Sequence, residues 1–261
     1  STLSTVFGIK RFSPMALPSA IISFLLLLLA PACLILDLHQ PLRFWHTLVP
    51  EYFNRTSALS YGSWLLTLYP IANLIYIYFI FVKNDKVTKI LGTMTVPLAI
   101  FVHAYTGFAF ALVRARAWWH SALMPGFFLT SALLSGIALL VVVAMIMNRF
   151  LKEKLDPDLF KSLRVMMIGI LLTDLFWTGC FWLTLLVSNA DGYASIMVAL
   201  HEKLYLWGEI VAGMLIPLVI LLAPRTRYDR NWLVLASLLI IGGVFLMRYS
   251  VVFIGFEIPL S

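Results

Sequence analysis

Seven long apolar stretches restrict the folds that are open to this chain. They run over residues 15–36, 61–83, 89–113, 122–148, 164–188, 203–223 and 232–255. A helix that crosses the hydrocarbon core of a bilayer needs about 20 mainly apolar residues, and each stretch is long enough. The chain is 62% hydrophobic and 12% charged, whereas soluble domains are about half apolar and a quarter charged. The sequence therefore predicts an all-α fold, a polytopic transmembrane helix bundle with seven full spans.

The remaining segments are short, so we expect residues 1–261 to form a single transmembrane domain. Residues 1–8 are apolar but too short to cross, and they lack the pattern of a signal peptide. We interpret them as the end of a preceding helix, which gives the complete subunit eight or more spans. The amphipathic connection 37–60 is expected to lie along the membrane interface. The connection 151–160 is expected to be a turn-rich connector.

Basic residues are distributed unequally between the two sets of connections. One set carries Lys10, Arg11, Lys83, Lys86, Lys89, Arg149, Lys152, Lys154, Lys161, Arg164, Arg225, Arg227 and Arg230. The other set carries only Arg43, Arg55, Arg114, Arg116 and Lys203. By the positive-inside rule the first set is cytoplasmic, so the C-terminus is expected to face the outside of the cell membrane. Orientation thus accounts for the net charge of +7, and nucleic acid is not expected as a partner.

Four ionisable residues lie inside the apolar stretches: His103, Asp174, Glu209 and Arg248. An ionised side chain at the centre of a spanning helix costs about 2.5–3.5 kcal/mol on insertion scales, so such groups face one another, a cavity or a polar ligand. Counting along each stretch places Asp174 near the midplane and the other three in the outer half. We therefore expect the polar chemistry in the outer half of the bundle.

A polar outer half suits an amphipathic ligand that enters from the lipid, such as a quinone. The two carbonyl oxygens of a quinone accept hydrogen bonds, and its reduction takes up two protons. Imidazole can donate such a bond and pass a proton near neutral pH, which makes His103 the leading candidate. Tyr105 and Tyr249 are further hydroxyl donors. The candidates for relaying the proton, or for holding a carboxylate charged at depth, are Asp174, Glu209 and Arg248.

Structural roles remain alternatives for several of these residues. His103 can bridge helices by a hydrogen bond, and Arg248 can pair with Glu209 to fix helix packing. Asp37 can cap the end of a helix. The Trp118-Trp119 pair can belong to the aromatic belt at the membrane interface.

The residue patterns of redox metal sites are missing from the sequence. Haem b in a membrane needs paired axial histidines, but only His103 lies deep, and iron–sulfur ligation needs clustered cysteines. Cys33 and Cys180 are isolated and are interpreted as small core residues. We therefore expect no haem, no iron–sulfur cluster and no metal ligand in this chain. If it handles electrons, it must exchange them with a partner subunit docked on the outer face.

Specific strings resemble a known family. Residues 36–45, LDLHQPLRFW, resemble the LDLGRPLRFW signature of the NrfD/PsrC family, the membrane subunits of polysulfide reductase and related iron–sulfur–molybdenum oxidoreductases. The block from His103 to Ile137, including RARAWWHSALMPGFFLTSALLSG, is similar to the family's most recognisable block. The strings GIKRF at 8–12 and RYSVV at 248–252 also fit the family.

The resemblance implies a quinone-binding subunit without haem, with menaquinone as the expected quinone near the extracytoplasmic face. It also implies an extracytoplasmic, ferredoxin-like iron–sulfur partner, with a molybdopterin or multihaem cytochrome subunit beyond it. The family histidine of the third span matches His103, and the Asp and Arg of the family's outer loop match Asp37 and Arg43. Ala109 stands where some relatives carry an aspartate on a proposed proton path, so no relay is expected there.

The expected site has three parts. Quinone binding and proton transfer are assigned to His103, Tyr105, Asp37, Arg43, Glu209, Arg248 and Tyr249. A proton path is assigned to Asp174, and the partner-docking rim to Arg114, Arg116, Trp119 and His120. The protein is expected to work within a multi-subunit oxidoreductase and not to be catalytic alone.

Two other functional classes also use polar groups inside a membrane bundle. An ion-coupled secondary transporter contains buried ionisable groups, but it predicts polar residues across the midplane and broken helices. The outer-half bias disfavours this alternative, although Asp174 fits it. A retinal protein needs a lysine inside a span, and no apolar stretch has one in its interior.

Overall fold

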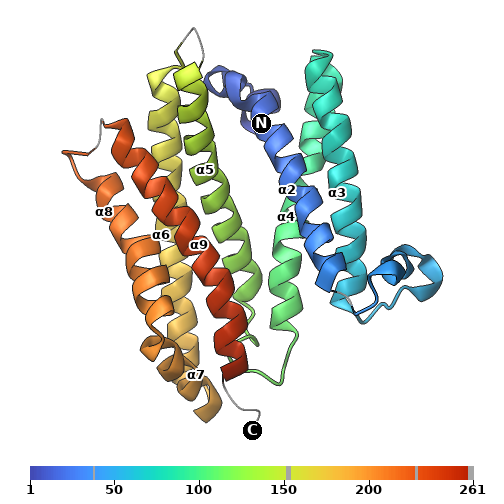
Figure 1. Ribbon diagram of the computed structural model, residues 1–261, viewed down its shortest axis with the longest axis vertical. Helices are drawn as coiled ribbons and strands as arrows, with labels where there is room; N and C mark the ends of the chain where they lie inside the picture. The colour runs from blue at the N-terminus through green and yellow to red at the C-terminus, as the bar shows by residue number, and fades with distance from the viewer. Residues whose placement is uncertain (38, 151–153, 227–228, 258–261) are drawn as a thin grey trace. The chain divides into compact units, whose positions relative to one another are not determined.

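The computed structural model describes residues 1–37, 39–150, 154–226 and 229–257, and all regular structure in these ranges is helical (Figure 1). Seven helical segments there are long and apolar enough to cross a membrane. They are Lys10–Leu36, Ala58–Phe81, Asp85–Ala111, Met124–Phe150, Pro157–Val187, Leu204–Leu222 and Arg230–Glu257. The prediction of an all-α fold with seven spans is confirmed.

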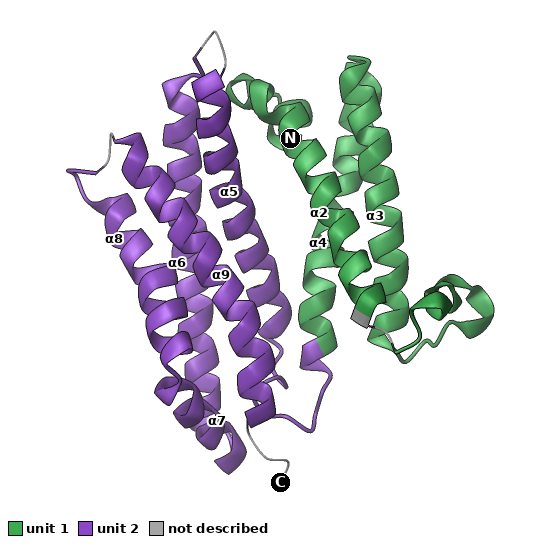
Figure 2. Ribbon diagram, viewed as in Figure 1, with its two compact units in different colours: residues 1–109 green, residues 110–261 purple. Residues whose placement is uncertain are grey.

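The protein divides into two compact units, Ser1–Ala109 and Phe110–Ser261 (Figure 2). Unit 1 holds the long helices α2 (Ala16–Asp37) and α3 (Ala58–Phe81) and all but the last two residues of α4 (Asp85–Ala111). Its short elements are α1 (Thr2–Thr5) and three 3₁₀ helices, η1 (Lys10–Met15), η2 (Pro41–Leu48) and η3 (Pro50–Tyr52). Unit 2 holds α5 (Met124–Phe150), α6 (Pro157–Val187), α7 (Ala190–His201), the π-helical η4 (Leu204–Leu215), α8 (Ile216–Leu222) and α9 (Arg230–Glu257).

Side chains from three helices form the apolar core of unit 1. Leu27 of α2, Tyr69 of α3 and Val102 of α4 are buried together. A buried polar bond helps to tie α2 to α3: the Asn73 side-chain amide donates to the Ala20 carbonyl at 3.2 Å. A buried amide without a partner would cost free energy, so this bond helps to fix the packing of the two helices.

The connection predicted to be amphipathic, residues 37–60, contains η2 and η3. Leu42 is 89% exposed and Trp45 is 49% exposed. Large apolar side chains with this exposure suit contact with lipid at the membrane surface. An interfacial location for the segment stays a prediction.

Helix α9 is the central element of unit 2, since it packs against α5, η4 and α8 (Figure 1). Its closest approach to η4 is a glycine pair. A Cβ atom added to Gly243 would overlap the Cα atom of Gly213. Small residues allow such close backbone contact between membrane helices.

We expect Gly243→Ala to lower the free energy of unfolding by about 1–3 kcal/mol, because the added methyl group has no room between two backbones. The neighbouring Gly242 supplies a matched control, since a Cβ there meets nothing within 4 Å. Gly242→Ala should be neutral or slightly stabilising, because alanine favours a helix over glycine. Thermal unfolding in detergent checks both, and equal effects of the two substitutions would contradict the packing argument.

Three features of unit 2 differ from the sequence prediction. Helix α6 begins at Pro157, seven positions before the predicted span, so the expected connector is partly helical; residues 151–153 lie outside the described residues. Asp156 caps the helix by accepting from the Asp158 amide, and proline at the first helical position is favourable. Arg164, predicted to lie in a connection, is therefore inside α6 and donates to the Leu221 carbonyl.

The other two differences concern the segment after α6. Helix α7 is an additional helix before the sixth span, capped by Asn189. The first 12 residues of the span itself, Leu204–Leu215, are π-helical. A π-helical segment is rare and is frequently found at functional sites.

Candidate functional site

His103 lies in α4 and is partly buried. Its Nδ1 atom is 2.7 Å from the carbonyl oxygen of Ala99. Because a carbonyl can only accept, Nδ1 must carry a proton, and the neutral ring then offers Nε2 as its acceptor. The ring can therefore take a proton from a hydroxyl group, and once protonated it can donate to a carbonyl.

Tyr105 is only two residues from His103, which places the two side chains about 200° apart around the helix. Its ring packs against α3 at Gly62, where an added Cβ would overlap the ring. The sequence grouped His103 and Tyr105 as donors to one ligand. The structure instead puts them on different faces of α4, and Tyr105 fills the contact with α3.

Asp37 and Arg43 are the two site residues predicted in the outer loop of unit 1. Asp37 is the last residue of α2, and its side chain lies outside what the structure describes. Arg43 lies in η2 and is exposed.

Three ionisable residues inside the spans of unit 2 form a polar cluster: Asp174, Glu209 and Arg248. We name it the α5–α9 cluster, because helices from α5 to α9 supply these residues and their hydrogen-bond partners. Asp174 of α6 is 1% exposed and accepts from the Thr130 hydroxyl of α5 at 2.7 Å. It interacts electrostatically with both Arg248 and Glu209.

Arg248 is held mainly by α5. Its Nη2 donates to the Ser131 hydroxyl at 2.9 Å and to the Phe128 carbonyl at 3.2 Å. The guanidinium also lies over the Phe128 ring, 3.8 Å from its centroid, a geometry that stabilises a cation. The adjacent Tyr249 is partly exposed, and its ring stacks on that of Phe253 with 4.1 Å between the ring centroids.

Glu209 is 3% exposed and lies within the π-helical segment. Ser250 of α9 approaches its carboxyl group, but Oε2 has no hydrogen-bond partner within the described part of the sequence. The α5–α9 cluster thus contains two carboxyl groups and one guanidinium, and Asp174 interacts with both of the other members. A buried group of this composition is neutral only when it also holds one proton or another cation.

The hydroxyl partners of the cluster, Thr130 and Ser131, were not predicted as functional residues from the sequence. Thr130 and Ser131 are neighbours on α5, and each binds a different charged group of the cluster. Helical spacing alone could not identify them, because small hydroxyl residues are common at membrane-helix contacts.

The four residues of the predicted docking rim fall into two groups. Arg116 and Trp119 are bound to α9, by bonds of 2.6 Å to the carbonyls of Gly255 and Val251 respectively. Trp119 is only 7% exposed. Arg114 and His120 are exposed, and the His120 ring is 2.9 Å from the Ala111 carbonyl.

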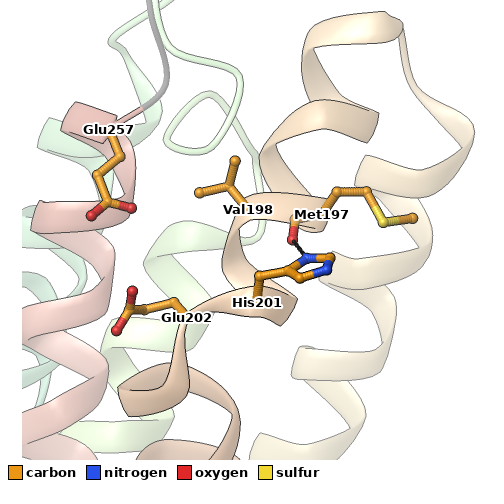
Figure 3. A pocket seen from close by; sticks show the side chains of 5 residues that line it. All are labelled: Met197, Val198, His201, Glu202 and Glu257. Atoms are coloured by element: carbon orange, nitrogen blue, oxygen red, sulfur yellow. Dashed lines mark hydrogen bonds between the residues drawn. The ribbon is translucent and has the colours of Figure 1, made fainter.

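A shallow pocket lies between α7 and the end of α9, lined by Met197, Val198, His201, Glu202 and Glu257 (Figure 3). The carboxyl groups of Glu202 and Glu257 lie on one side of it, while the His201 ring turns to the Met197 carbonyl at 2.7 Å. The three ionisable groups do not converge. Among the described residues, no three His, Cys, Asp or Glu side chains form a set that could hold a metal ion.

Comparison with known proteins gives a match over nearly the whole sequence. Residues 1–259 match the family described as "Polysulphide reductase, NrfD". The "Hdr-like menaquinol oxidoreductase integral membrane subunit" of Archaeoglobus fulgidus is 29% identical over 99% of this chain and 66% of its own length. A selenate reductase subunit of Mesobacillus selenatarsenatis is 27% identical over 99% of this chain and 70% of its own length.

A third relative, one of the polypeptides of the polysulfide reductase of Wolinella succinogenes, is 23% identical over 85% of this chain and 76% of its own length. The protein thus spans roughly two thirds of the length of the first two relatives. Since the family match covers far more than half of a sequence with seven candidate membrane spans, the protein belongs to the NrfD/PsrC family of polysulphide reductase membrane subunits.

Proposed function

We propose that this protein is the quinone-reactive membrane subunit of a respiratory oxidoreductase complex. It binds menaquinone or menaquinol near the extracytoplasmic face and exchanges electrons with an iron–sulfur partner subunit. The observation that carries the proposal is the family match over residues 1–259. A relative aligned with 99% of this chain is named as a menaquinol oxidoreductase subunit, which favours menaquinol.

His103 is the proposed proton-transfer group. Oxidation of a quinol to a quinone releases two electrons and two protons, and a base near the hydroxyl group must accept each proton. With Nδ1 bound to Ala99, neutral His103 has the correct tautomer to accept a proton at Nε2. In the reverse direction the protonated ring donates to a quinone oxygen. Asp37 and Arg43 of the outer loop are proposed to tune this site.

The α5–α9 cluster is the proposed proton-carrying group of unit 2. Its charge count supports this role, since a cluster of two carboxyl groups and one guanidinium has room for one exchangeable proton. Glu209 is the better carrier, because its Oε2 has no partner among the described residues. Asp174 is bound to Thr130 and interacts with Arg248, so it is better suited to hold a fixed charge. Tyr249, which follows Arg248 in the sequence, is a further proposed quinone-binding residue.

The electrons are proposed to pass to a ferredoxin-like subunit on the extracytoplasmic face, with a molybdopterin or multihaem cytochrome subunit beyond it. Arg114 and His120 are the exposed members of the rim that would dock it, whereas Arg116 and Trp119 hold the rim to α9. In this orientation the C-terminus faces outside. The transporter alternative is disfavoured because the relatives are named as parts of oxidoreductases.

Purification of the protein from its native membrane in a mild detergent tests this proposal. We expect iron–sulfur absorption to migrate with it and to bleach when a soluble menaquinol analogue is added. A protein that purifies alone and drives ion uptake in liposomes would support the transporter alternative instead.

A further inference from the structure

A second cavity, of about 500 Å³, opens at one end of unit 2. Its walls come from the connection 112–123, the last turn of α6, the first turn of α7 and Gly255 of α9. None of the α5–α9 cluster residues lines it. It is therefore separate from that cluster. Its wall includes Arg114, Arg116 and His120 of the proposed docking rim, so the inference assigns a second ligand to part of that rim and rests on the proposed function to that extent.

The polar groups of this cavity favour an anion. Arg114 and Arg116 line it, against one carboxylate, Asp191. The N-terminal end of α7 also forms part of the wall, through Ser188 and Asn189. A helix of 12 residues directs its first amide groups and the positive end of its dipole toward this end.

A buried donor in the wall supports the same interpretation. Trp118 lines the cavity and is 2% exposed, and its Nε1 has no hydrogen-bond partner among the residues that the structure describes. An indole nitrogen can only donate. A buried donor without an acceptor is unfavourable, so a ligand whose acceptor oxygen reached Nε1 would satisfy a group that the protein leaves unpaired.

The surroundings indicate an amphipathic ligand. The cavity lies at the ends of membrane-spanning helices, and close to its lining residues Thr184 and Leu185 helix α6 carries exposed apolar side chains. Leu183 is 63% exposed and Val187 is 83% exposed. An acyl chain can lie against such side chains while a charged headgroup occupies the cavity.

We propose that this cavity binds a phosphate-bearing anion, namely the headgroup of an anionic phospholipid at the membrane surface. Phosphate oxygens accept hydrogen bonds from the arginine side chains, the start of α7 and the Trp118 nitrogen. The same chemistry would accept free phosphate, so the test must separate the two sources.

The test uses the complex purified in detergent and stripped of lipid, then incubated with phosphatidylglycerol or phosphatidylcholine. Bound lipid is counted by native mass spectrometry. We expect the wild type to retain phosphatidylglycerol preferentially, and Arg114→Gln to reduce this retention about fivefold, the effect of one arginine at a charged membrane surface. Arg55→Gln removes an exposed arginine from the 37–60 connection and should leave retention unchanged.

Trp118→Phe keeps an aromatic ring but removes the unpaired donor, so it should also weaken the retention of phosphatidylglycerol. It replaces Arg114→Gln as the test variant if that protein does not fold. Equal retention of both lipids by the wild type, or unchanged retention in both variants, would overturn the proposal. Thermal unfolding of the stripped complex separates the two sources of phosphate. If inorganic phosphate stabilises the complex as much as phosphatidylglycerol does, the cavity binds phosphate, and the proposal that its ligand is a lipid headgroup is overturned. Loss of a partner subunit from Arg114→Gln with lipid retention intact would show that the cavity is a protein-docking site.

Discussion

Replacing His103 by alanine is expected to reduce quinol-coupled turnover by about 10²–10⁴-fold, the range that a positioned general acid or base contributes. The His103 side chain bonds to Ala99 within its own helix, so the substitution should leave the α4 backbone bonds in place. The complex should therefore still assemble. Turnover with a soluble menaquinol analogue, measured together with the amount of copurified partner, checks both expectations.

His201 supplies a matched control for this experiment. Its Nδ1 atom is 2.7 Å from the carbonyl of Met197, four residues earlier on α7, which repeats the local geometry of His103. His201→Ala should retain turnover, because its ring lies at the exposed end of α7. An assembled His103→Ala complex with wild-type turnover would remove His103 from the proposed role.

The predicted spans agree with the helices to within a few residues at most ends, because span length and apolar composition are set by the bilayer. The exception at α6 has a local cause. Asp156-Pro157-Asp158 is typical of a turn, but an acidic cap followed by proline also starts a helix. The π-helical form of Leu204–Leu215 could not be predicted, since no residue pattern distinguishes it from an α-helical span.

The sequence identified the buried ionisable residues but not their partners. That Arg248 binds Ser131 and lies over the Phe128 ring depends on how α5 packs on α9, which no local pattern gives. The opposite orientations of His103 and Tyr105, in contrast, follow from helical periodicity. Their separation could therefore have been predicted from the sequence alone.

Removing the guanidinium of Arg248 is expected to destabilise unit 2 by about 3–5 kcal/mol, the usual effect of deleting one partner of a buried charge pair. In Arg248→Gln, Asp174 remains 1% exposed without its neighbouring cation, and the contact with the Phe128 ring is lost. Thermal unfolding in detergent measures the change. Arg230→Gln is the control, because that arginine also lies over a ring, Phe160 at 4.9 Å, and should cost about 1 kcal/mol or less.

A second substitution separates the charge effect from the loss of packing. If Asp174 is destabilising because its charge lacks a partner, then Asp174→Asn in the Arg248→Gln background should recover about 0.5–3 kcal/mol, the coupling range of residues in one network. Asparagine can still accept from the Thr130 hydroxyl, so the contact between α5 and α6 is kept. Strict additivity of the two substitutions would mean that Arg248 stabilises unit 2 through its contacts with α5 alone, and that the α5–α9 cluster does not act as one electrostatic unit.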